Sequence, residues 1–480
     1  MSAFDLLVRR ARLVDGTGAP AVVADLAVRA GRIVAVGEIG SGSARRIVDA
    51  DGLALAPGFI DAHCHDDRAI IDTPLLEPKI SQGVTTVVNG NCGISIAPVL
   101  PGRPAAKAPL GAFTAGGARF ERFGDYFAAL EASPPAVNSA CFCGHSNLRH
   151  AAMDSVDRAA TPAEITHMAA LLDGALRDGA LGLSTGLYYP AASAAPTEEV
   201  VALAHTVARH GARYATHMRN EEDHVTDSLA ETFRIGREAG VPVIVSHHKC
   251  MSRANHGKSA ITLPMFERAA REQDVGLDAY PYRASSTLLF PERVAKCDRV
   301  VITWSEPMPD AAGRDLADIA AQLGCSDIEA ARRLLPAGAI YFQMSEVDVR
   351  RILAFPDTMI GSDGIVFEPH PHPRAWGTFP RVLGHYARDV GLFSLEEAVR
   401  KMTSLTAARF GLAGRGRLAP GYHADLVLFD PARVIDVADF ADPCRPAEGI
   451  EQVFVNGEPV WARGSATGRR PGRCLRRTGG

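Results

Sequence analysis

The sequence predicts an α/β fold of the TIM (β/α)8 barrel type, with a small β-domain built from both chain termini and an inserted subdomain after the seventh barrel strand. Eight short β-like runs alternate with helix-like segments along the middle of the chain. Polar residues with metal-binding side chains follow five of these runs and are absent from the starts of the runs. Because functional residues gather at the C-terminal ends of barrel strands, this placement favours a barrel over a doubly wound open sheet.

The eight candidate strands are short and rich in apolar or β-branched residues. In chain order they are residues 53–60, 83–88, 139–145, 181–186, 212–216, 241–246, 276–280 and 358–362. The segments between them carry helix signals. Thr161 and Glu164 form a capping box, with proline at the first helical position. Apolar residues recur at helical spacing in segments 197–210, 225–239 and 263–273.

The two ends of the chain have a different pattern, with short strands separated by Asp-Gly and Gly-rich turns. Near the C-terminus, Asn456-Gly457 lies between two apolar runs, which is a strong signal for a β-hairpin. We therefore expect residues 1–57 and 415–480 to form one β-domain, and residues 58–414 to form the barrel. The stretch from about 284 to 340 interrupts the barrel rhythm, and we expect it to overhang the C-terminal face.

Composition narrows the possible classes of function. Of the 480 residues, 47% are hydrophobic and 22% are charged, and the net charge is −4. These values are ordinary for a globular protein and give no reason to expect nucleic acid or a membrane surface as a partner. No apolar stretch reaches the length of a spanning helix, and the first eight residues lack a signal-peptide pattern. Nine scattered cysteines argue against a disulfide framework, so we expect a cytoplasmic protein with reduced thiols.

A pair of histidines directly follows the first strand. His63 and His65 are two residues apart, and in an extended backbone such side chains point to the same side. Both imidazoles can therefore approach one point in space. The other metal-compatible side chains that follow strand ends are Cys92, His217, His247 and Asp363. Together, these residue types at these positions predict a metal site on the C-terminal face.

Several motifs resemble those of the amidohydrolase superfamily, and specifically those of the D-aminoacylases (N-acyl-D-amino-acid deacylases). The resemblance covers essentially the whole chain. The pair of histidines alone indicates only an amidohydrolase-like protein, whereas the cysteine motif together with Ser-His-His-Lys is much more specific. The motifs are GFIDAHCHDD at 58–67, GVTTVV at 83–88, GNCG at 90–93, SHHK at 246–249, AYPY at 279–282, GSDG at 361–364, PHPR at 371–374 and GTFP at 377–380.

Zinc is the metal that the sequence favours. It prefers thiolate, imidazole and carboxylate ligands, and the best set here is Cys92, His217 and His247. Many members of the superfamily bridge two metals with a modified lysine after the fourth strand, but this sequence has no lysine between Lys107 and Lys249. The resemblance implies that Cys92 supplies the anionic ligand instead, which gives one tight Zn2+ site.

A second metal position is also implied. His63 and His65, together with Asp363, would form a weaker site whose occupancy the sequence does not fix. The two histidines would otherwise only shape the pocket and support Asp363.

Asp363 is expected to be the general base and acid. A carboxylate beside a metal-bound water can accept the water's proton and then deliver that proton to the departing amine, which must be protonated to leave. The competing interpretation is that Asp363 only caps the following turn, because Asp-Gly is a common turn pair.

The substrate is expected to carry a free carboxylate. Lys249 lies two residues past His247 and so points to the same side, and Arg374 follows the eighth strand. Both cations suit a carboxylate, which accepts charge-assisted hydrogen bonds. The resemblance implies that these two residues bind the α-carboxylate together with Tyr280 and Ser286. It places Tyr188 or Tyr189 near the scissile bond. The competing interpretation for each is an ordinary surface charge or a core tyrosine.

The sequence thus predicts zinc-dependent hydrolysis of N-acyl-D-amino acids to a D-amino acid and a carboxylate. One alternative is a deacylase specific for N-acyl-D-glutamate or N-acyl-D-aspartate, which needs an extra basic group such as Arg293. Another is a cyclic amide hydrolase of the dihydroorotase or hydantoinase kind, which the missing lysine disfavours. A non-catalytic relative of such enzymes is a further alternative, against which the intact ligand set argues.

Overall fold

The computed structural model of the chain describes residues 4–39, 43–102 and 119–477. Two parallel sheets form the centre of the molecule, one ordered β6-β7-β8 and the other β17-β13-β12-β11-β10-β9. Their strands are β6 (Phe59–Asp61), β7 (Val84–Asn89), β8 (Asn138–Cys141), β9 (Cys143–Gly144), β10 (Gly182–Gly186), β11 (Arg213–His217), β12 (Val243–Val245), β13 (Val275–Ala279) and β17 (Thr358–Ile360).

Backbone hydrogen bonds join the two sheets at both seams. At one seam Phe142 interrupts the third strand, separating β8 from β9, and its N–H donates to the carbonyl of Asn89 over 2.9 Å. At the other seam the N–H of Ala62 donates to the carbonyl of Ile360 over 3.1 Å. Eight parallel strand positions therefore form a ring, an arrangement consistent with the predicted barrel.

Helices connect successive strands, and the Thr161 capping box begins one of them as predicted. The Thr161 hydroxyl accepts from the N–H of Glu164, and the Glu164 carboxylate accepts from the N–H of Thr161. No helix in the described part of the chain is both long and apolar enough to cross a membrane. The helices around the barrel are α1 (Ala69–Asp72), α2 (Glu77–Ile80), α4 (Phe123–Ala132), α5 (His145–Ala152), α6 (Pro162–Asp178), α7 (Thr197–Arg209), α8 (Val225–Ala239), α9 (Ser259–Ala269), α12 (Glu346–Ala354), α13 (Arg374–Arg381), the π-helix η4 (Val382–Asp389), α14 (Leu395–Met402) and α15 (Ser404–Phe410), with the short 3-10 helix η1 (Arg253–Asn255).

Both ends of the chain contribute to one mostly antiparallel sheet, ordered β21-β20-β19-β18-β5-β1-β2-β3, with β4 paired to β1. The predicted hairpin is present, because Val455 pairs with Glu458 across Asn456 and Gly457, whose φ angles are both positive. Residues 1–3, 40–42 and 478–480 of the expected β-domain lie outside the described residues. The strands are β1 (Phe4–Leu13), β2 (Val22–Arg29), β3 (Arg32–Gly37), β4 (Ala44–Asp49), β5 (Ala54–Pro57), β18 (Leu426–Phe429), β19 (Ile450–Val455), β20 (Glu458–Ala462) and β21 (Ser465–Ala466).

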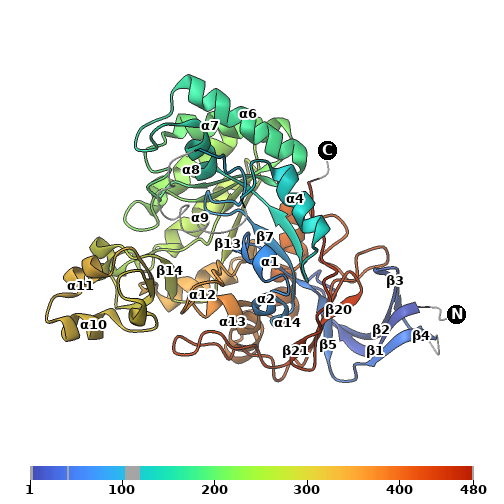
Figure 1. Cartoon of the computed structure of the whole chain (residues 1–480). Coiled ribbons are helices and arrows are strands. Elements are labelled where there is room, and N and C mark those ends of the chain that lie inside the picture. Colours follow the sequence, from blue (N-terminus) through green and yellow to red (C-terminus); the bar gives the residue numbers. More distant parts are fainter. Residues whose placement is uncertain (1–3, 40–42, 103–118, 478–480) are drawn as a thin grey trace.

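The segment between β13 and β17 contains a third, antiparallel sheet, ordered β14-β16-β15. This sheet packs with two helices around apolar side chains that include Ile302, Leu316 and Leu334. Figure 1 shows α10 and α11 on the opposite side of the molecule from β1–β4. The elements are β14 (Ala284–Leu288), η2 (Pro291–Lys296), β15 (Arg299–Ser305), η3 (Pro309–Ala311), α10 (Leu316–Leu323), α11 (Asp327–Leu334) and β16 (Ala337–Phe342).

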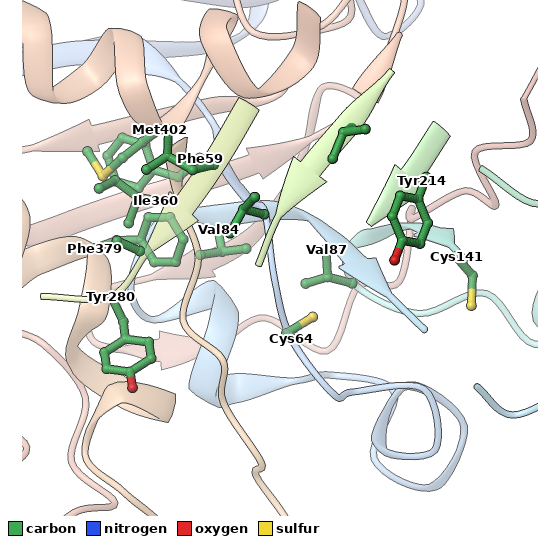
Figure 2. Close-up of a cluster of buried hydrophobic side chains, with 14 of the residues drawn as sticks. Phe59, Cys64, Val84, Val87, Cys141, Tyr214, Tyr280, Ile360, Phe379 and Met402 are labelled. Carbon is green, nitrogen blue, oxygen red and sulfur yellow. The ribbon is translucent and has the colours of Figure 1, made fainter. Parts of the chain in front are cut away.

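The largest core cluster lies between the barrel strands and the helices that cover them (Figure 2). The ring of Phe59 on β6 stacks on that of Phe379 on α13, with centroids 5.9 Å apart and planes 7° from parallel. Ile360 and Met402 are buried in the same cluster, so the first strand, the eighth strand and α14 share one core. The seam between the first and last strands is therefore well packed.

A buried ion pair also crosses this seam. Lys79 is fully buried, and its ammonium lies 2.7 Å from Asp61 Oδ2 and 3.3 Å from Asp66 Oδ2. It also donates to Ser362 Oγ over 2.8 Å, while Asp61 Oδ1 accepts from the N–H of Ser362. Burial alone would lower the pKa of Lys79, but the carboxylates of Asp61 and Asp66 raise it above its usual value. Hydrogen bonds from this ion pair to Ser362 thus link the end of β6 to the turn after β17.

Lys79→Met is expected to lower the free energy of unfolding by about 3–5 kcal/mol, because it leaves the carboxylates of Asp61 and Asp66 buried without their cation. Urea denaturation monitored by tryptophan fluorescence measures this loss. Lys296→Met is the control, because Lys296 pairs with Glu222 but is 48% exposed, and we expect a change of about 1 kcal/mol or less. Similar losses in the two variants would contradict a structural role for the buried pair.

Candidate metal centre and substrate pocket

The predicted metal-compatible side chains come together at the C-terminal ends of the barrel strands. Cys92 follows β7, His217 ends β11 and His247 follows β12. His63 follows β6, and Asp363 follows β17, on the opposite side of the seam. The closed sheet brings these residues together from positions up to 300 residues apart in the chain.

The sulfur of Cys92 lies at the centre of the group. It is 3.3 Å from His63 Nε2, 3.3 Å from His247 Nε2 and 3.7 Å from His217 Nδ1. Burial alone would raise the pKa of the Cys92 thiol, but the surrounding imidazoles lower it well below its usual value. The surroundings therefore favour the thiolate, the form in which cysteine binds metals.

Three of these residues hold unusual backbone conformations. Cys92, His247 and Asp363 have φ angles of 55°, 36° and 49°, in the left-handed region that side-chain-bearing residues rarely occupy. Each such residue costs of order 1–3 kcal/mol and persists where the surrounding structure imposes it. Strain at three converging positions is a signature of a functional site.

Asp363 lies at the edge of the same group. Its Oδ1 is 3.2 Å from His65 Nε2 and 3.5 Å from His63 Nε2, and its Oδ2 is 2.8 Å from Arg374 Nη1. Burial alone would raise the pKa of Asp363, but Arg374 and the histidines hold it well below its usual value. The carboxylate is thus ionised and is in contact with both the histidine cluster and a cation.

The donor set fits zinc. The metal-facing atoms of His63, Cys92, His247 and Asp363 all lie within 4.8 Å of one another, and all four residues are buried. His217 adds a further imidazole nitrogen to the same thiolate. Thiolate, imidazole and carboxylate donors are the ligands zinc prefers, whereas calcium and magnesium require oxygen.

Two buried carboxylates that the sequence reasoning did not identify support these histidines. Glu221 lies 3.1 Å from His247 Nδ1 and 3.5 Å from His217 Nε2. Asp278, on β13, accepts from the N–H of His247 and lies 3.5 Å from His63 Nδ1. The sequence contains a signal for both, because each acidic residue is in or just after a strand of the barrel, where metal-ligating histidines usually find carboxylate partners.

A pocket opens beside Cys92 and Asp363. The barrel contributes His65 and Tyr189, and the segment between β13 and β17 contributes Ser286 and Trp304. Half of the remaining lining residues are apolar. The other lining residues are Cys92, Ile94, Thr287, Leu288, Asp363, Ile365, Phe367 and Glu368. Of the predicted substrate-binding residues, Tyr189 and Ser286 therefore line this pocket directly.

Arg374 and Lys249 lie against the ring of Tyr280. The Arg374 guanidinium carbon is 4.6 Å from the ring centroid, and Lys249 Nζ is 5.7 Å from it. Among the described residues, neither the buried Tyr280 hydroxyl nor Arg374 Nε has a hydrogen-bond partner. Lys249 instead pairs with Glu221, at 2.8 Å. As the alternation predicts, Lys249 points to the same side as His247, with its Nζ 2.8 Å from His247 Nδ1.

Tyr188 stacks on the ring of His217, with centroids 5.6 Å apart. The Arg293 guanidinium lies over the Tyr188 ring, 4.7 Å from its centroid, and Arg293 Nε is 3.6 Å from Glu222 Oε1. Arg293 is buried but does not line the pocket beside Cys92. Tyr188 thus supports a candidate ligand, and Arg293 is already paired with an acidic side chain.

Several known proteins resemble this chain over nearly its full length. A D-aminoacylase of Alcaligenes xylosoxydans xylosoxydans is 55% identical over 99% of this chain and 98% of its own. An N-acyl-D-aspartate deacylase of the same organism is 50% identical over 98% of this chain and 95% of its own. Among solved structures, an N-acyl-D-glutamate deacylase from Bordetella bronchiseptica, complexed with zinc and a phosphonate inhibitor, is 48% identical with a TM-score of 0.95, over 98% of this chain and 99% of that one.

A D-aminoacylase structure described for its binuclear metal centre is 54% identical, with a TM-score of 0.96 over 99% of this chain and 100% of that one. The sequence model of the Amidohydrolase family matches residues 46–260 and 247–461, which together span most of the chain. Sequence, fold and the arrangement of metal donors agree, and this chain belongs to the amidohydrolase family.

Proposed function

We propose that this protein is a zinc-dependent deacylase of N-acyl-D-amino acids, which it hydrolyses to a D-amino acid and a carboxylate. The observation that carries the proposal is the Cys92 thiolate among three imidazoles, with Asp363 and Arg374 directly beside it. The 55% identity to a D-aminoacylase over nearly the whole chain supports the same activity.

Cys92, His217 and His247 would hold the tight zinc ion. A zinc ion in such a site supplies a nucleophile by lowering the pKa of bound water, and polarises the amide carbonyl. His63, His65 and Asp363 would form the second, weaker position, which the binuclear centre described for a D-aminoacylase supports. Tyr189, whose ring is 4.8 Å from that of His217, would border the acyl group.

Asp363 would transfer the protons. Its Oδ1 faces the histidine cluster, so the carboxylate can accept a proton from the attacking water and then donate it to the amine. Arg374 holds the other oxygen, at 2.8 Å, and so fixes the orientation of the carboxylate.

The substrate α-carboxylate would bind to Arg374 and the Tyr280 hydroxyl. Both present buried donors that lack hydrogen-bond partners in the described part of the chain, which is costly unless a ligand supplies acceptors. Lys249 lies against the same Tyr280 ring and would add positive charge, and Ser286 borders the pocket from β14.

The pocket composition supports a neutral side chain on the substrate. Its apolar residues and the pairing of Arg293 with Glu222 favour the broad deacylase over an enzyme specific for D-glutamate or D-aspartate. The cyclic amide hydrolase is not favoured, because relatives at about half identity act on N-acyl-D-amino acids.

We also propose that the chain is divided into a catalytic domain and a separate β-domain. Residues 58–414 would form the catalytic barrel, and residues 1–57 with 415–480 the β-domain. The insertion at about 284–340 would cover the substrate, which is supported by the positions of Ser286, Leu288 and Trp304 in the pocket wall.

Cys92→Ala is expected to abolish both zinc binding and deacylation, because it removes the anionic ligand of the tight site. Purified wild-type protein should hold about one tightly bound zinc per chain, measured by elemental analysis. Cys143→Ala is the control, because Cys143 is also a buried free cysteine and, in the described part of the chain, makes no hydrogen bond to the candidate ligands. A Cys92→Ala variant with full zinc content and normal turnover would exclude the proposed site.

Asp363→Asn should keep zinc in the tight site but reduce kcat by roughly 10²–10⁴-fold, because both proton transfers depend on the carboxylate. Steady-state hydrolysis of an N-acetyl-D-amino acid measures the loss, and zinc content shows that the site is intact. Turnover within tenfold of wild type would remove Asp363 from the mechanism.

Arg374→Met should lower kcat/KM for N-acetyl-D-leucine by an amount equivalent to about 2–5 kcal/mol, as expected for removing one partner of a buried charge pair. The loss should be much smaller for an N-acetyl amine that has no carboxylate. Arg381→Met, on the same helix but paired with Asp436, is the control. Equal losses on the two substrates would mean that Arg374 acts through Asp363 or through folding and not on the substrate carboxylate, and equal wild-type rates on D and L isomers would contradict the stereospecificity.

A further inference from the structure

Glu221 occupies an unusual place beside the metal centre. It lies in the loop between β11 and α8, four residues after His217, and its side chain is 1% exposed. Nothing in the proposed reaction requires this carboxylate, because proton transfer is assigned to Asp363. Its two oxygens nevertheless face two different candidate zinc ligands.

The two histidines present opposite ring nitrogens to Cys92. His217 directs Nδ1 to the sulfur and Nε2 to Glu221 Oε2, at 3.7 Å and 3.5 Å. His247 directs Nε2 to the sulfur and Nδ1 to Glu221 Oε1, at 3.3 Å and 3.1 Å. One carboxylate therefore faces the far side of both rings, although the rings are oriented differently.

A neutral imidazole has one N–H and one lone pair, so the nitrogen that binds a metal is bare only if the proton is on the other nitrogen. That second nitrogen needs an acceptor, which commonly is a carboxylate. Glu221 offers one oxygen to each ring. Its position thus selects the Nε2–H tautomer of His217 and the Nδ1–H tautomer of His247.

Among the described residues, neither His217 Nε2 nor Glu221 Oε2 makes a hydrogen bond, and the two buried atoms face each other at 3.5 Å. The other neighbour of His247 Nδ1 is Lys249 Nζ, at 2.8 Å. An ammonium group can only donate, so Lys249 alone would favour a proton on Nε2, where it blocks the metal.

The same atoms could in principle bind a second cation, because donor atoms of His217, Glu221 and His247 lie within 4.8 Å of one another. The Lys249 ammonium, however, already lies 2.8 Å from Glu221 Oε1. A positive charge is thus present at this point, and a metal ion there would be repelled. The arrangement favours an orienting carboxylate over another metal ligand.

We propose that Glu221 is the positioning residue of the metal centre, which sets the tautomers of His217 and His247 against the opposing influence of Lys249 so that both rings turn a bare nitrogen toward Cys92. The inference deepens the proposed function, because it concerns the same zinc site.

Zinc affinity of the metal-free full-length protein tests the proposal directly, by competition with a chromophoric chelator. Glu221→Gln keeps the size of the side chain but leaves one oxygen acceptor for two rings, and should weaken zinc binding by about 10–100-fold. Two controls should keep wild-type affinity. Glu222→Gln removes the adjacent charge, and Glu199→Gln removes a buried carboxylate that pairs with His145 and Arg149, which are not ligands.

A double variant separates tautomer control from a general structural role. Adding Lys249→Met to Glu221→Gln removes the donor that holds the proton on His247 Nε2, and should restore part of the zinc affinity. The visible absorption of the Co2+-substituted proteins should change in Glu221→Gln and recover toward wild type in the double variant. If the double variant binds zinc no better than Glu221→Gln, then Glu221 does not act through the tautomers.

The outcomes distinguish this inference from the proposed function. Wild-type zinc affinity in Glu221→Gln would overturn the role of Glu221 and leave the deacylase assignment unaffected. A wild-type protein that binds zinc but releases no acid from any N-acyl-D-amino acid would contradict the assignment and leave the role of Glu221 standing.

Discussion

The negative charge on the buried Cys92 sulfur is the constraint on which the rest of the site depends. A thiolate away from water is costly unless cations or polarised N–H groups surround it. Three imidazoles surround it, each with a ring nitrogen within 3.7 Å of the sulfur, and a zinc ion held by these atoms would supply the compensating positive charge. The arrangement suits zinc, because the ring nitrogens around the sulfur are the other candidate ligands.

The imidazoles are in turn held by carboxylates. Asp278 contacts His63 and the backbone of His247, and Glu221 faces His217 and His247. These carboxylates face the ring nitrogens that point away from the sulfur. Negative charge behind the histidines strengthens them as ligands and fixes which nitrogen is free. The positive φ angles of Cys92 and His247 are a strained backbone conformation that orients these side chains toward the site, at a cost in local stability.

At the seam between β6 and β17, a buried ion pair that stabilises the fold lies next to the proposed catalytic base. The Asp61–Lys79 pair holds Ser362, and the next residue is Asp363, whose φ is 49°. The N–H of Asp363 also donates to the carbonyl of His63, over 2.7 Å. The turn that carries the proposed base is therefore held by the Asp61–Lys79 pair and by the backbone that follows the first strand.

The sequence by itself determined the alternating strands and helices, the capping box at Thr161, the hairpin at Asn456-Gly457 and the positions of Cys92, His217, His247 and Asp363 at strand ends. These features are local, since hydrophobic periodicity, turn residues and residue type can each be identified within a short segment of sequence. Only the tertiary structure decided the partners: that Glu221 faces two histidines, that Lys249 pairs with Glu221, and that Arg374 shares Asp363. Such contacts depend on side-chain direction and on closure of the barrel across hundreds of residues, and no local pattern encodes either.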